Sequence, residues 1–235
     1  MVAVAQWRWF PPGQARWQRR VALAILAADA ALVTGLAADG SVVRHPGGWG
    51  YVVEALSAVM IYAAAAVGLT GSGRSSVATA RAVGIRLGVI TGGMWVAHLV
   101  IETFAGLRGW PNLAVTASSL LGGFALWGVG GAMTRRRTGS VPVSVLSAVC
   151  AAMVCVAFTI TVGFTLAYLA QPRLEHNIDG SPEYLRSAWL DLHAFAIANT
   201  LDAGFTHALI APLVAAITGT IGAVAARPAG RGEPR

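Results

Sequence analysis

Six apolar segments, each 18 or more residues long, occupy most of this 235-residue chain. They cover residues 21–38, 51–69, 83–107, 112–133, 142–170 and 194–225. An α-helix rises about 1.5 Å per residue, so a segment of this length crosses a hydrocarbon core of about 30 Å. Helices also satisfy their own backbone hydrogen bonds in lipid. The sequence therefore predicts an all-α fold: a polytopic integral membrane bundle of six transmembrane helices spanning residues 21–225.

The composition supports this class and argues against nucleic acid as a partner. Hydrophobic residues make up 56% of the chain and charged residues only 11%, whereas soluble proteins carry about 25% charged residues. The net charge of +7 comes entirely from arginine, which excludes lysine Schiff-base chemistry. These arginines lie between the spans and do not form one basic face with interleaved aromatic residues. The expected partners are the lipid bilayer and, beyond it, other membrane subunits or further copies of this chain.

The segments outside the spans suggest how the chain meets the membrane surface. Residues 1–20 mix tryptophan with arginine, which is typical of an interfacial arm in the headgroup layer. The alternative for this region is a signal peptide that is cleaved after residues 21–38. Ser181-Pro182-Glu183-Tyr184 has the pattern of a helix start and predicts a short amphipathic helix before the last span. The basic tail, residues 226–235, is expected to be disordered.

The distribution of arginine between the loops predicts the orientation. One side of the six-span topology receives the N-terminal arginines, Arg74, Arg81, the cluster Arg135–Arg137 and the C-terminal arginines. The opposite side receives Arg44, Arg108, Arg173 and Arg186. Because cytoplasmic loops carry the excess of positive charge, we expect a protein of the cell membrane with both termini in the cytoplasm.

Polar and ionisable residues inside the spans are the candidate functional residues, since such groups are costly in hydrocarbon. His98 and Glu102 form an i, i+4 pair on the third span. The last span contains Asn199, Asp202 and His207. In the predicted topology these five residues all lie in the outer half of the membrane. We therefore expect the third and sixth spans to share a polar pocket that opens outward.

Two further carboxylates stand near or inside spans. Glu54 opens the second span on the outer side, where it either caps the helix or joins the pocket. Asp29 lies within the first span and is either a hydrogen-bonded structural residue or an intramembrane proton or ion site.

Several chemistries remain open for the polar residues. His98, Glu102, Asp202 and His207 are of the types that bind a divalent metal, although Asp202 and His207 point about 140° apart on a regular helix. Haem b between His98 and His207 is a second alternative. Proton or ion exchange between a carboxylate and a histidine needs fewer coincidences. Hydrogen bonding between helices is the purely structural interpretation.

The expected function is correspondingly broad. The chain lacks a Gly-x-Ser-x-Gly elbow, a phosphate-binding loop and a His-Glu-x-x-His motif, which favours a role without catalysis. We expect a small transporter-like or accessory membrane protein with no cofactor. The alternative is a membrane-embedded enzyme or redox subunit that uses a metal or haem at the His98, Glu102, Asp202 and His207 cluster.

Overall fold

Six long helices form the bundle in the computed structural model, which describes residues 15–107 and 109–226. They are α1 (Ala15–Ala38), α3 (Gly48–Gly71), α4 (Ser75–Ala105), α5 (Trp110–Thr138), α6 (Val141–Leu169) and α9 (Leu192–Ala225). Each is long and apolar enough to cross a membrane. The described residues form no strand, and the predicted all-α, six-span fold is confirmed.

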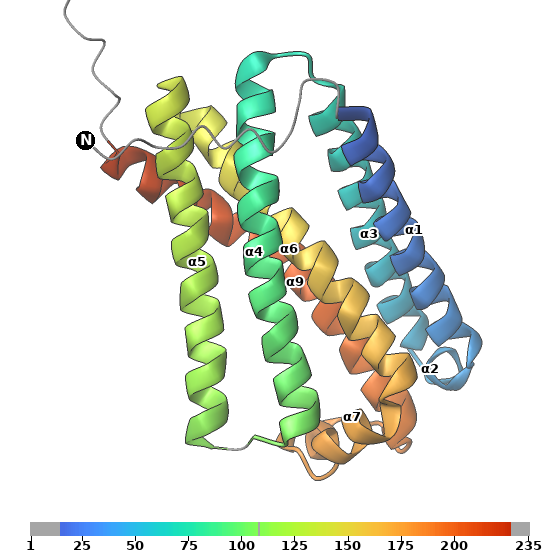
Figure 1. Cartoon of the computed structure of the whole chain (residues 1–235). Coiled ribbons are helices and arrows are strands. Elements are labelled where there is room, and N and C mark those ends of the chain that lie inside the picture. The colour runs from blue at the N-terminus through green and yellow to red at the C-terminus, as the bar shows by residue number, and fades with distance from the viewer. Residues whose placement is uncertain (1–14, 108, 227–235) are drawn as a thin grey trace, which may run out of the picture.

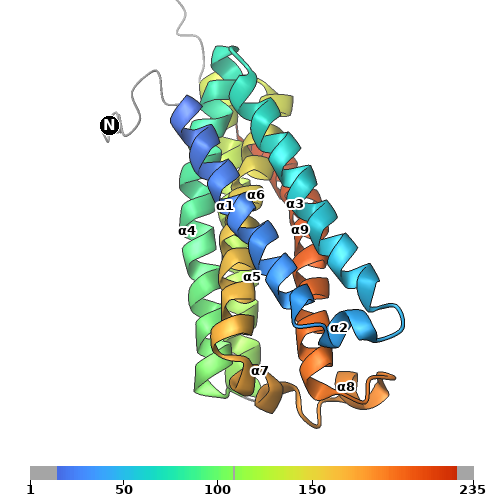
Figure 2. The ribbon, with the colours of Figure 1, turned by 90° about the vertical axis from the view of Figure 1, so that its right-hand side faces the viewer.

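Three short helices gather at one end of the bundle (Figures 1 and 2). They are α2 (Ser41–Arg44), α7 (Gln171–Ile178) and α8 (Pro182–Arg186). We call this the α7 end, and we call the opposite end, which carries Arg16, Arg19, Arg20, Arg74 and Arg135–Arg137, the arginine-rich end. The Ser181 hydroxyl accepts a hydrogen bond from the Tyr184 N–H at 3.2 Å, so the helix predicted there is confirmed. An additional helix, α7, precedes it.

Helices α1 and α5 extend beyond the predicted boundaries of the first and fourth spans. Helix α1 begins at Ala15, so the last part of the predicted arm continues directly into the first span, while residues 1–14 lie outside the described residues. The predicted tail also lies outside them from residue 227 onward. Helix α5 extends through the arginine cluster to Thr138, because Gly139 adopts the left-handed conformation (φ 67°) that ends a helix.

Helix α6 is the centre of the bundle. It packs against α4, α5 and α9, and α1 contacts its remaining side, while α3 packs against α1 and α9 (Figures 1 and 2). Gly84, Gly88 and Gly92 of α4 face it. A Cβ atom placed on Gly88 would lie 2.6 Å from the carbonyl oxygen of Ala151, so the two backbones approach more closely than any side chain would allow.

A proline inside α9 is compensated by a side chain from α3. Pro212 has no N–H, so the carbonyl of Ala208, four residues earlier, loses its usual helical donor. The Tyr62 hydroxyl donates to this carbonyl oxygen at 3.0 Å. A backbone group that lipid could not hydrate is thereby satisfied, and α3 is fixed against α9 one residue after His207.

Candidate functional site

A cavity of about 510 Å³ lies between α4, α5, α6, α7 and α9, and we call it the α4–α9 pocket. It reaches from α7 at one end of the bundle to Trp95 and His207 within the membrane-spanning helices. His98, Glu102, Asn199 and His207, four of the residues singled out in the sequence, line it. Polar residues of the third and sixth spans, apart from Asp202, therefore line one cavity.

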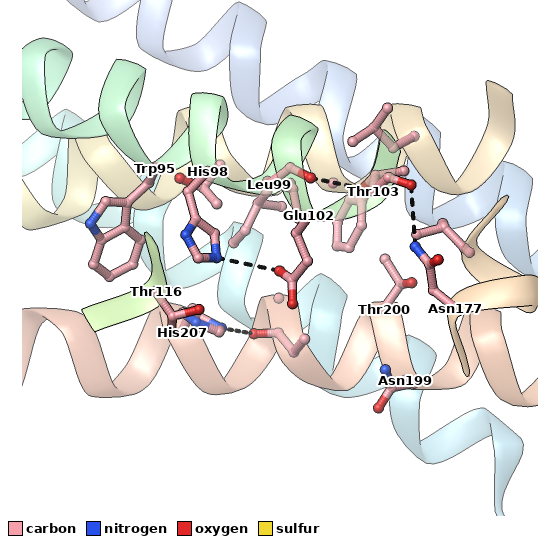
Figure 3. A pocket seen from close by; sticks show the side chains of 18 of the residues that line it. Trp95, His98, Leu99, Glu102, Thr103, Thr116, Asn177, Asn199, Thr200 and His207 are labelled. Atoms are coloured by element: carbon pink, nitrogen blue, oxygen red, sulfur yellow. Dashed lines mark hydrogen bonds and ion pairs between the residues drawn. The ribbon is translucent and has the colours of Figure 1, made fainter. Parts of the chain in front are cut away.

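The His98–Glu102 contact on α4 is formed as the i, i+4 spacing predicts. His98 Nε2 lies 3.3 Å from Glu102 Oε2 (Figure 3). The His98 side chain is 15% exposed and that of Glu102 47% exposed, so the carboxylate is the more accessible member of the pair. The wall of the pocket therefore carries Glu102 in contact with His98, and not as an isolated carboxylate.

The opposite wall carries His207, whose orientation is fixed by the backbone of α9. His207 Nδ1 lies 2.6 Å from the carbonyl oxygen of Ala203 (Figure 3). A carbonyl can only accept, so Nδ1 carries the hydrogen and a neutral His207 presents Nε2 as an acceptor. The Trp95 ring meets His207 edge-on, with ring centroids 6.0 Å apart, and its Nε1–H donates to the Ser119 carbonyl at 3.0 Å. Helices α4, α5 and α9 are therefore linked at the inner end of the pocket.

Asp202 and Glu54 do not join this pocket. They line a separate cavity of about 400 Å³ near the α7 end, together with His45, Tyr51 and Trp189. Asp202 lies five residues before His207, which on a helix is a rotation of about 140°. The expected single cluster is therefore divided between two sides of α9.

No described group of three or more histidine, cysteine or acidic side chains is placed to hold a metal ion. Of the four residues predicted as metal ligands, His98, Glu102 and His207 line the α4–α9 pocket, whereas Asp202 lines the other cavity. His98 directs Nε2 at Glu102, and its remaining ring nitrogen, Nδ1, is buried without a hydrogen-bond partner. The haem b alternative stays a prediction.

Asp29 lies apart from both cavities in a tight structural setting. Asp29 is 1% exposed, and the Thr161 hydroxyl of α6 lies 2.7 Å from Asp29 Oδ1. The same hydroxyl lies 2.8 Å from the Ala157 carbonyl oxygen. The single hydroxyl hydrogen therefore has two nearby acceptors, and the contact ties α1 to α6. This arrangement suits the structural interpretation of Asp29.

A polar network at the α7 end was not predicted. His193, near the start of α9, places Nδ1 3.0 Å from Glu175 Oε1 of α7 and Nε2 3.1 Å from Asp39 Oδ1 after α1. Gln171 Nε2 donates to Glu175 Oε1 at 2.8 Å. Hydrogen bonding from Ser41, followed by His193, lowers the pKa of Asp39 despite some desolvation. Asp39, Glu175 and His193 all adjoin span ends on one side, which is the signal that could have indicated the network.

Comparison with known proteins gives no family assignment. No family model, no curated protein and no solved structure matches this chain.

Proposed function

We propose that this chain is a small transporter-like protein of the cell membrane that binds a small molecule in the α4–α9 pocket. Both termini lie in the cytoplasm, and the pocket opens to the outside at the α7 end. The observation that carries the proposal is the cavity itself, because about 510 Å³ is within the roughly 300–1,000 Å³ typical of small-molecule sites. The His98–Glu102 pair supports it further, since intramembrane ionisable groups commonly mark substrate or ion pathways.

The charge distribution supports this orientation. Every described carboxylate lies in the half of the bundle nearer the α7 end, whereas the arginine-rich end carries Arg135–Arg137 and the arginines at the start of α1. Positive residues are retained on the cytoplasmic side of a membrane. The proposal therefore places the α7 end, with α7 and α8, on the outer side.

The outer faces of the helices favour lipid or a neighbouring membrane subunit as partner. Leu213, Ile217 and Ile221 of α9 are all more than 60% exposed and lie on successive turns. Apolar side chains in such a row are stable against acyl chains or another apolar helix. A homo-oligomer or an accessory role in a membrane complex fits the same surface.

The proposal can be tested by thiol labelling in intact cells. Cys150 and Cys155 are first replaced by alanine, since both are free thiols. Ala203→Cys introduces a thiol that lines the pocket, and Leu213→Cys introduces one on the apolar face of the same helix. We expect a membrane-impermeant thiol reagent to label position 203 from outside and to leave position 213 unlabelled, because thiolates do not form in hydrocarbon. Equal labelling of the two positions, or labelling of 203 only in broken cells, would refute an outward-facing pocket.

A further inference from the structure

We propose that the ligand of the α4–α9 pocket is an organic cation, a protonated amine on an apolar body. This inference rests on the proposed function, which requires only that the pocket binds some small molecule. Its basis is a chemical bias in the lining: most of the side-chain donors there already donate their hydrogens inside the protein. What they still offer a ligand is acceptor lone pairs.

The threonine hydroxyls show the bias most clearly. Four of them in the pocket lie within bonding distance of the carbonyl oxygen four residues earlier: Thr103 to Leu99 at 2.8 Å, Thr116 to Asn112 at 2.9 Å, Thr159 to Cys155 at 3.0 Å and Thr200 to Ala196 at 2.9 Å. A hydroxyl has one hydrogen and two lone pairs. Since the hydrogen is donated along the helix, each oxygen can only accept a hydrogen bond from a further partner.

The nitrogen donors of the lining are engaged in the same way. The hydrogen on His207 Nδ1 is donated to Ala203, which leaves Nε2 as an acceptor. The indole N–H of Trp95 is donated to Ser119, and Asn177 Nδ2 donates to the Thr103 carbonyl at 3.2 Å. His98 directs Nε2 at Glu102, so a neutral His98 keeps Nδ1 as an acceptor. The donors that remain are the hydroxyl of Ser119, the amide of Asn199 and the second hydrogen of Asn177.

The formal charge of the pocket agrees with its hydrogen-bonding character. Glu102 is the one carboxylate among the described lining residues, and these residues include no arginine, so the lining is formally anionic when His98 and His207 are neutral. An ammonium group supplies three donors and a positive charge, so it can meet Glu102 and several threonine oxygens at once. The rings of Trp95 and Phe164 and the surrounding leucines suit an apolar body and favour a nearby cation. An anionic ligand would instead bring its charge against Glu102 with few donors to receive it.

The test uses three probes of one shape: phenethylammonium, 2-phenylethanol and phenylacetate. Each is added during thiol labelling of Ala203→Cys, and protection is measured as a slower labelling rate. We expect phenethylammonium to protect at a concentration about tenfold or more below that at which the alcohol protects, since a charged hydrogen bond contributes at least this factor. Phenylacetate is expected to give no protection.

Two variants test whether protection by phenethylammonium depends on the carboxylate of Glu102. Glu102→Gln is expected to weaken protection by phenethylammonium about tenfold, whereas Asp202→Asn, on the other side of α9, should leave it unchanged. Equal protection by the alcohol or the acid, or protection by none of the three, would overturn the cation proposal while labelling of position 203 still supports a ligand pocket. Failure to label position 203 would instead refute the proposed function. The preference among probes in the chain with intact Glu102 decides the matter even if Glu102→Gln does not fold.

Discussion

Replacing Gly131 by alanine is expected to lower the free energy of unfolding by about 1–3 kcal/mol, the usual cost of overpacking a close contact. A Cβ atom at Gly131 of α5 would collide with the backbone of Gly219 in α9. Gly128 and Gly222 meet in the same manner, backbone against backbone. The atoms nearest to a Cβ at Gly131 or Gly222 all belong to the backbone and cannot rotate aside, so α5 and α9 would have to separate.

Gly93→Ala is the matched control. Gly93 lies inside α4, and a Cβ atom there would meet nothing within 4 Å. Alanine is a better helix former than glycine by about 0.5–1 kcal/mol, so this variant should be as stable as the parent or slightly more stable. Thermal unfolding in detergent measures both. Similar melting temperatures for the two variants would mean that α5 and α9 do not cross at these glycines.

Thr161→Val is expected to destabilise the bundle by about 1–3 kcal/mol, because a buried polar group left without its partner keeps its desolvation cost. Asp29 loses the hydroxyl at 2.7 Å, and at 1% exposure its side chain is shielded from bulk solvent. Thr165→Val, one turn further along α6, removes a hydroxyl that bonds only to the Thr161 carbonyl, and little change is expected there.

The double variant Asp29→Val with Thr161→Val tests whether the two side chains stabilise the bundle through their contact with each other or independently. Replacing both partners by apolar groups can be nearly neutral, so the double variant should be more stable than the sum of the two single changes predicts. Strict additivity in chemical or thermal unfolding would show that Asp29 and Thr161 do not interact.

The sequence was sufficient for features that depend on spacing along one helix. Six spans follow from the length of the apolar segments, and the His98–Glu102 pair follows from the i, i+4 separation. The start of α8 at Ser181 follows from local capping chemistry. Each of these is a short-range property, so neighbouring residues contain the information.

Features that depend on how helices are rotated against one another were not predictable. Asp202 and His207 share a helix, but Asp202 lines the cavity beside the start of α3, whereas His207 lines the cavity whose walls include α4, α5 and α6. The contact of His193 with Asp39 joins residues 154 positions apart, and hydropathy does not encode such a pairing. The same holds for Thr161 and Asp29, which are recognisable as partners only once α1 lies against α6.

The central claim, that α4 and α9 enclose one pocket between His98 and His207, is tested most directly by crosslinking. Cysteines are placed at 98 and 207, or at 98 and 202, in a chain without Cys150 and Cys155, and each pair is treated with a short flexible bifunctional thiol reagent. The structure predicts a crosslink between 98 and 207, which line the same cavity, and none between 98 and 202, since Asp202 lines the other one. A crosslink at 98 and 202 without one at 98 and 207 would contradict the pocket and the ligand assigned to it.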